Sequence, residues 1–145
     1  MDDNRIAKAS TTVNTTIDKA WDALITPAAV KQYMFGTTIA SDWHKGSAIT
    51  WKGDWKGKPY EDKGVILDIE PTRLLRYTHF SPLAGLPNRP ENYHTVSYAV
   101  TGDDDQSTLT ITQENNRDQA EVDESQKTWT TILEGLKKVV EDSPR

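Results

Sequence analysis

Histidine is the residue type in this chain best suited to acid–base chemistry, and there are three of them. His79 alternates with Leu75 and Tyr77 in a segment typical of a strand, so its side chain is expected on the same inward face. His44 and His94 lie in or near expected loops and are predicted to be on the surface. A buried histidine is more often a hydrogen-bonded structural residue than a catalyst, and we favour that interpretation for His79. The chain has no G-x-S-x-G nucleophile motif, so no catalytic residue is predicted.

The chain contains no cysteine, and its acidic residues form no recognisable metal-binding motif. The lack of cysteine excludes thiol catalysis, cysteine-ligated zinc and a disulfide-stabilised secreted fold. Asp103, Asp104 and Asp105 fall in one expected hairpin turn, which cannot supply the roughly six or more oxygen ligands that Ca²⁺ takes. Gly53 and Gly57 are spaced as turn residues and not as a phosphate-binding loop. We therefore predict no metal and no cofactor.

Length and charge restrict the class of protein further. A chain of 145 residues is expected to form one domain over residues 1–145. Its formal net charge of −5 provides no electrostatic basis for binding nucleic acid. The lysines and aromatic residues between residues 51 and 60 are interrupted by acidic side chains, which favours an exposed hairpin rim over a nucleic-acid site. With neither a signal peptide nor about eighteen consecutive apolar residues, the protein is expected to be cytoplasmic, without a membrane span.

Aromatic residues on the expected inner faces are the strongest indication of a binding site. Any one of them could be an ordinary core residue. A sheet that wraps around a single helix, however, encloses more volume than the helix fills, so some of these side chains are expected to line a cavity. The proline-rich loop 81–92 is expected to cover its mouth. The residues predicted to bind a ligand there are Tyr33, Trp51, Tyr77, His79, Tyr98 and Trp129.

The elements that carry these residues follow from the hydrophobic pattern. Residues 5–13 are expected to form a first strand. Apolar residues at helical spacing follow from Ile17 to Leu24, with Thr15 as the expected N-cap. Thr26-Pro27 ends this helix and begins a second short one, which is expected to end at Gly36.

The middle of the chain has the pattern of antiparallel strands. Two of them are expected over residues 48–55 and 60–70, on either side of a glycine-rich turn. In the second of these, Val65, Leu67 and Ile69 form the more apolar face, which we expect to be buried. Three further strands with clear alternation follow before the last segment.

The last segment predicts a long amphipathic helix. Asp118 and Glu121 have the spacing of a capping box at its start. A helix of this kind needs a large apolar surface, and we expect the concave face of a curved antiparallel sheet to supply it. The predicted fold is α+β, with the sheet wrapped around this helix and two short helices after the first strand. The residues of the apolar stripe are Val122, Gln126, Trp129, Ile132, Leu133, Leu136, Val139 and Val140.

Several segments occur in the order that a known superfamily shows. They are the early helix with Ile17, Trp21 and Leu24 before Thr26-Pro27, the run Gly64-Val65-Ile66-Leu67-Asp68-Ile69-Glu70-Pro71, Leu75-x-Tyr77, Val96-x-Tyr98, Thr108-Leu109-Thr110-Ile111-Thr112, and the terminal helix with Trp129, Leu133 and Leu136. In these segments the chain resembles the helix-grip proteins of the START/Bet v 1 (SRPBCC) superfamily, and within it the bacterial proteins similar to the C-terminal domain of the activator of Hsp90 ATPase. The resemblance covers nearly the whole chain and implies the helix-grip fold.

The resemblance leaves the function open, because the superfamily includes ligand carriers, cyclases, hydrolases and co-chaperone domains. We favour non-enzymatic binding of a small hydrophobic or amphipathic molecule in a cavity between the sheet and the C-terminal helix. One alternative is regulation of an Hsp90-type chaperone ATPase, which the resemblance implies. The other is an enzyme that uses the cavity for acid–base chemistry, with His79 and a tyrosine as its active groups.

Overall fold

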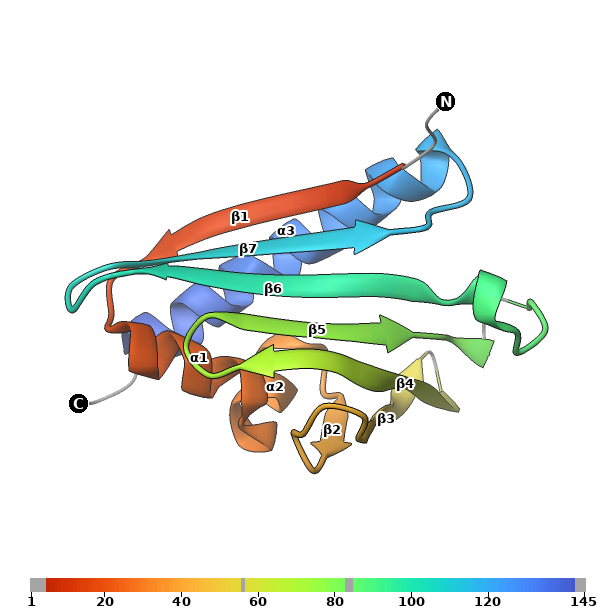
Figure 1. Cartoon of the computed structure of the whole chain (residues 1–145), viewed down its shortest axis with the longest axis horizontal. Helices are drawn as coiled ribbons and strands as arrows, with labels where there is room; N and C mark the ends of the chain where they lie inside the picture. Colours follow the sequence, from red (N-terminus) through yellow and green to blue (C-terminus); the bar gives the residue numbers. More distant parts are fainter. Residues whose placement is uncertain (1–4, 56, 83–84, 143–145) are drawn as a thin grey trace.

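The computed structural model describes residues 5–55, 57–82 and 85–142, which form one antiparallel sheet and three α-helices (Figure 1). The strands are β1 (Ala7–Val13), β2 (Thr38–Ser41), β3 (Ala48–Trp55), β4 (Lys58–Glu70), β5 (Leu74–His79), β6 (His94–Gly102) and β7 (Ser107–Glu114). The helices are α1 (Ile17–Ile25), α2 (Pro27–Tyr33) and α3 (Gln119–Asp142), and a short 3₁₀ turn lies at Pro90–Asn92.

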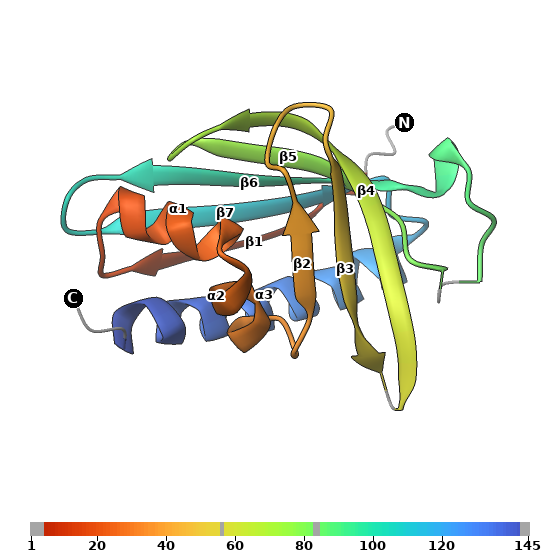
Figure 2. The ribbon, with the colours of Figure 1, turned by 90° about the horizontal axis from the view of Figure 1, so that it is seen from below.

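The sheet curves around the C-terminal helix. Its strands lie in the order β1-β7-β6-β5-β4-β3-β2, and each is antiparallel to its neighbours. Figure 2 shows β2 and β3 crossing α3 at a steep angle, whereas β1 and β7 run along it. Helix α3 packs against β1, β7, α1 and α2. This arrangement confirms the predicted α+β helix-grip fold.

Helix α3 buries the stripe that the sequence predicts. Asp118 begins the helix, and its Oδ1 accepts a hydrogen bond from the Glu121 backbone N–H at 2.9 Å, as the capping-box spacing predicts. Trp129, Leu133 and Leu136 lie in the core. Burial of this stripe stabilises the helix more than its intrinsic propensity does, because most helical stability in proteins comes from packing of an amphipathic face.

The two short helices differ from the prediction in one detail. Thr16, and not Thr15, caps α1: its side-chain oxygen accepts a hydrogen bond from the Lys19 N–H at 3.2 Å. Both threonines are suitable caps by type, and the extended backbone at Thr16 decides between them. Helix α2 begins at Pro27 as expected. The turn after it contains Gly36, whose φ of +81° is easily adopted by glycine.

The predicted buried face of β4 is wrong. Val65 and Leu67 are 42% and 38% exposed, whereas Ile66 between them is 1% exposed. The pairing of β4 with β5 shifts between Ile66 and Asp68, and after this bulge Ile69 turns back against the core. A bulge inserts one extra residue, so the residues that face the core before it and after it do not belong to the same alternating set.

Gly64 lets β4 approach β5 closely just before this bulge. A Cβ atom at Gly64 would lie 1.6 Å from the carbonyl oxygen of Thr78, which is far inside van der Waals contact. The Thr78 hydroxyl oxygen also accepts a hydrogen bond from the Val65 N–H at 3.0 Å. Glycine is the one residue type without a Cβ, so it permits this close approach of β4 to β5.

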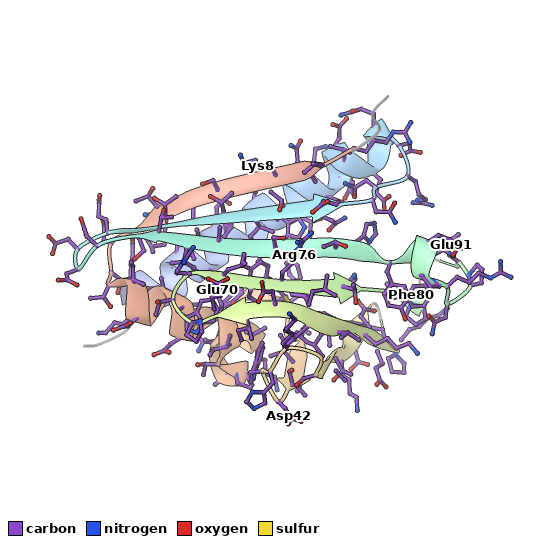
Figure 3. The ribbon with its side chains drawn as sticks, in the orientation of Figure 1. Lys8, Asp42, Glu70, Arg76, Phe80 and Glu91 are labelled. Carbon is purple, nitrogen blue, oxygen red and sulfur yellow. The ribbon has the colours of Figure 1, made fainter. Side chains whose placement is uncertain are left out.

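The face of the sheet turned away from α3 carries many polar side chains, together with the exposed Val65 and Leu67 of β4. Figure 3 shows side chains such as Lys8 on β1 and Arg76 on β5 on this face. A guanidinium nitrogen of Arg76 lies 3.7 Å from a carboxylate oxygen of Glu114 on β7. In the part of the chain that the structure describes, no helix combines the length and apolar character needed to cross a membrane.

Candidate ligand-binding site

A pocket of about 630 Å³ lies between α3 and the concave side of the sheet. Residues of β3, β4 and β5 form one wall, residues of α3 form the other, and the turn between α2 and β2 borders it. The volume falls within the roughly 300–1,000 Å³ typical of small-molecule sites. The apolar and aromatic residues that line it are Met34, Phe35, Trp51, Tyr60, Tyr77, Trp129 and Ile132.

A row of aromatic rings forms the floor of this pocket and continues behind it. The ring of Trp51 lies 5.1 Å from that of Tyr77 and 4.9 Å from that of His79, measured between ring centroids. Behind the pocket, the ring of Tyr98 lies 5.5 Å from Tyr77 and 5.9 Å from Trp129. These tilted and edge-to-face contacts are favourable geometries for aromatic pairs. They connect β3, β5, β6 and α3 through one continuous set of side chains.

The polar atoms of this aromatic row bond within the protein. The Tyr77 hydroxyl donates to the Tyr98 hydroxyl at 2.8 Å, and the indole N–H of Trp129 donates to Gln113 Oε1 at 2.9 Å. Burial raises the pKa of the Tyr77 and Tyr98 hydroxyls well above the ordinary value for tyrosine. Both therefore stay protonated at neutral pH. Tyr77 and Trp129 therefore line the pocket without a free hydrogen-bond donor to offer a ligand.

Asp62 and His79 form the polar end of the pocket. Asp62 on β4 is the cross-strand partner of Trp51 on β3, so the two side chains share the concave face. The Nε2 atom of His79 lies 2.9 Å from Asp62 Oδ2, at hydrogen-bond distance. The other carboxylate oxygen, Oδ1, is buried and has no hydrogen-bond partner among the described residues. The pocket thus contains a carboxylate with only one of its two oxygens paired.

The structure brings together four of the six residues predicted to bind a ligand. Trp51, Tyr77, His79 and Trp129 line the pocket. Two of the predicted residues, Tyr33 and Tyr98, are not among the lining residues.

Tyr33 and Tyr98 are structural residues instead. The Tyr33 hydroxyl donates to the Ala23 carbonyl oxygen at 2.7 Å, and Gly135 of α3 lies against its backbone, so Tyr33 connects α2 to both other helices. Burial raises its pKa well above the ordinary value. Tyr98 lies behind Tyr77 and holds its hydroxyl. Both face inward, but the packing of the helices decides which inward side chains border open space.

Asp62 and Gln113 are two polar lining residues that sequence reasoning missed. Asp62 was missed because the acidic residues next to the lysines and aromatic residues of this hairpin favour an exposed rim when the charge pattern alone is considered. The alternation of Asp62 with Gly64 and Ile66 on one face of that strand was the available signal. Gln113 shares the buried face of β7 with Ile111, and a polar residue on such a face could have been recognised in the same way.

The surface position predicted for His94 is also wrong. Its side chain is 21% exposed, and its Nε2 atom lies 3.1 Å from Glu121 Oε2 at the start of α3. Burial lowers the pKa of His94, although the Glu121 carboxylate acts in the opposite direction. The rings of His94 and His79 are 6.5 Å apart, so the two histidine–carboxylate pairs lie next to each other.

The loop between β5 and β6 borders the main pocket through Ser81. Its later residues Leu86, Glu91 and Asn92 instead line a second, smaller pocket of about 70 Å³ beside His94. Residues 83 and 84 of the predicted loop lie outside the described residues. The described part of the loop thus lies at one end of the main pocket.

The described residues include no group of three or more His, Cys, Asp or Glu side chains that could hold a metal ion. In the acidic turn, Asp103 Oδ1 accepts the backbone N–H groups of Asp105 and Gln106 at 2.8 and 3.0 Å. These hydrogen bonds lower the pKa of Asp103. Its carboxylate therefore stabilises the hairpin turn itself.

Comparison with known families identifies this architecture. Residues 14–141 match the family described as activator of Hsp90 ATPase homolog 1-like protein. The chain belongs to this family. The match runs from just before α1 to the last turn of α3, and it confirms the resemblance found in the sequence. A search of the curated proteins found none that matches the chain.

Solved structures of the family fold resemble this protein over nearly its whole length. A solution structure from Cytophaga hutchinsonii is 48% identical, covers 98% of this chain and 97% of its own, and superposes with a TM-score of 0.84. The Aha1 dimer from Colwellia psychrerythraea is 18% identical, with 94% and 96% coverage and a TM-score of 0.73. A crystal structure from Mesorhizobium loti is 18% identical, with 97% and 99% coverage and a TM-score of 0.76. At these lower identities the likeness concerns the fold alone.

Proposed function

We propose that this protein binds a small amphipathic molecule in the pocket between α3 and the sheet and does not change it chemically. The observation that carries this proposal is the pocket itself, which holds about 630 Å³, has an aromatic floor and is polar at one end. Small-molecule sites combine a mostly apolar lining with a few polar groups that orient the ligand. Trp51, Tyr77 and Trp129 would supply the apolar part, and Asp62 with His79 the polar part.

A neutral fluorescent probe tests the proposal directly. N-phenyl-1-naphthylamine is apolar, fluoresces in apolar surroundings and carries no charge at neutral pH. We expect it to bind with a dissociation constant in the micromolar range, seen as an increase in its fluorescence. Native mass spectrometry should then detect one probe molecule per chain.

Two variants of α3 serve as a matched pair for this test. Thr128 and Thr130 are both exposed residues of α3, but of the two only Thr128 lines the pocket. Thr128→Trp should fill the pocket and weaken probe binding at least about tenfold, which is ~1.4 kcal/mol. Thr130→Trp should bind the probe like the wild type. Equal binding by both variants would mean that the probe binds elsewhere, and the pocket would lose its assigned role.

The Asp62–His79 pair favours one alternative, an enzyme with a general base. A histidine held by a carboxylate can abstract a proton, and general acid–base action contributes roughly 10²–10⁴-fold to a rate. The discriminating observation is the chemical state of a molecule recovered from the pocket. A recovered product, with turnover lost in His79→Gln while binding is retained, would replace the binding proposal by the enzyme.

The description of the family favours a second alternative, regulation of an Hsp90-type ATPase. The Aha1 dimer from Colwellia psychrerythraea shares the fold at 18% identity. Stimulation of a purified Hsp90 ATPase by this protein would support that role. The Thr128→Trp variant separates the two functions, because filling the pocket should abolish ligand binding and leave a protein–protein contact elsewhere unaffected.

A further inference from the structure

Apart from His79, which is paired with Asp62, the ionisable acidic and basic side chains that line the pocket are all carboxylates. Three carboxylate side chains line it, those of Asp54, Asp62 and Glu124, and among the described lining residues there is neither lysine nor arginine. Asp54 and Glu124 are exposed, and Asp62 is only 15% exposed by its side chain. A cleft lined by one sign of charge with apolar walls concentrates its electrostatic field inside. The pocket should therefore attract cations and repel anions.

Asp62 is the carboxylate with the largest effect inside the pocket. Its Oδ2 is hydrogen-bonded to His79, but its Oδ1 is buried and has no partner among the described residues. A buried carboxylate oxygen without a donor is costly, since most buried polar atoms are paired. A positive charge placed in the pocket would stabilise this carboxylate, because charges interact more strongly away from bulk water.

The aromatic floor favours the same type of ligand. Trp51 lies directly opposite Asp62 across the β3–β4 pair, and Tyr77 lies 5.1 Å from Trp51. The hydroxyl of Tyr77 and the indole N–H of Trp129 are already bonded within the protein. Aromatic ring faces attract ammonium groups, and tryptophan does so most strongly.

We propose that the pocket selects an organic cation: a molecule with a protonated amine on an apolar chain or ring, the amine next to Asp62 and Trp51 and the apolar part towards Trp129 and Ile132. This inference rests on the proposed function and adds the class of ligand to it. Amphipathic carboxylates such as fatty acids are disfavoured, because their head group would meet the Asp62 carboxylate in a pocket whose described lining holds no lysine or arginine.

Three ligands of equal chain length test the inference on the wild-type protein. Decylammonium, 1-decanol and decanoate differ only in the head group, and their binding can be measured at pH 7.5 by displacement of N-phenyl-1-naphthylamine. We expect decylammonium to bind at least about tenfold more tightly than decanoate, a difference of ~1.4 kcal/mol, with decanol between them. This comparison needs no variant, so it remains decisive even if a substitution prevents folding.

A matched pair of variants assigns the selectivity to Asp62. Asp62→Asn keeps the shape of the side chain and removes its charge, and Asp68→Asn removes the same charge from the same strand outside the pocket. The ratio of the affinity for decylammonium to the affinity for decanoate should fall about tenfold in Asp62→Asn. The same ratio should stay unchanged in Asp68→Asn. An equal fall in both variants would mean that the overall charge of −5 attracts the cation, and the assignment to Asp62 would be wrong.

The outcomes separate this inference from the proposed function. If decanoate binds as tightly as decylammonium, and Thr128→Trp weakens both, the cation selectivity is overturned and ligand binding in the pocket stands. If N-phenyl-1-naphthylamine and all three ligands fail to bind, both proposals are overturned. If the selectivity persists in Asp62→Asn, a different group recognises the head group, and the inference as stated is overturned.

Discussion

Replacing Trp129 by alanine should destabilise the protein by about 3–5 kcal/mol, the range usual for loss of a buried tryptophan. The indole is 8% exposed and packs against Tyr98, and its N–H donates to Gln113. Because Trp129 also lines the pocket, the space that it leaves merges with existing open volume, which places the expected value near the lower end of the range. Leu133 is smaller than Trp129 but only 1% exposed, so Leu133→Ala should destabilise the protein by a similar amount, about 3 kcal/mol.

Trp129→Phe separates the hydrogen bond from the buried ring. Phenylalanine keeps most of the apolar contact and leaves Gln113 Oε1 without the indole donor, so we expect a loss of about 1–2 kcal/mol. Urea unfolding followed by far-ultraviolet circular dichroism measures all three variants without relying on tryptophan fluorescence. The exposed neighbour Thr130→Ala is the control and should change stability by less than about 0.5 kcal/mol. A loss below about 1 kcal/mol for Trp129→Ala would contradict its place in the core.

Two further predictions concern the packing of β4 and the protonation of His94. Gly64→Ala should lower the free energy of unfolding, measured with urea, by at least about 3 kcal/mol, since its Cβ would lie 1.6 Å from the Thr78 carbonyl oxygen. Gly46 has open space around it, so Gly46→Ala should lower the free energy of unfolding only by the ~1–2 kcal/mol that an alanine at positive φ costs. Similar losses for both would contradict the close approach of β4 and β5. Because the pKa of His94 is lowered in the folded state, the unfolded chain binds its proton more readily, so the free energy of unfolding should fall as the pH decreases below about 6.5. His94→Gln should show a smaller decrease between pH 7.5 and 5, and an identical decrease in both proteins would refute this cause.

The fold could be predicted because its signals are local and repeated. The stripe from Val122 to Val140 and the cap at Asp118 specify α3 from the sequence alone, since helical spacing and capping depend only on neighbouring residues. Alternation predicted the inward faces of β5 and β7, including the inward direction of His79. An amphipathic helix of this length and a set of half-buried strands can cover their apolar faces only against each other, which specifies the α+β arrangement.

The alternation of apolar residues predicted the wrong buried face in β4, where pairing with a neighbouring strand introduces a bulge. In β4 the bulge after Ile66 reverses the buried face, and this bulge is defined by the pairing with β5 and not by the spacing of apolar residues within β4. Asp62 was missed because its importance depends on its position opposite Trp51 on another strand.

Sequence patterns alone predict the three helices, every strand of the described sheet except β2, and the inward direction of most aromatic side chains. Which of these side chains border open space depends on how the elements pack: Trp51 and Tyr77 line the pocket, whereas Tyr33 is enclosed by the helices and Tyr98 lies behind Tyr77. The pairing of Asp62 with His79 belongs to the tertiary structure as well. The physical reason is that element formation depends on residues close in the chain, whereas a pocket is the volume that remains after distant elements have packed.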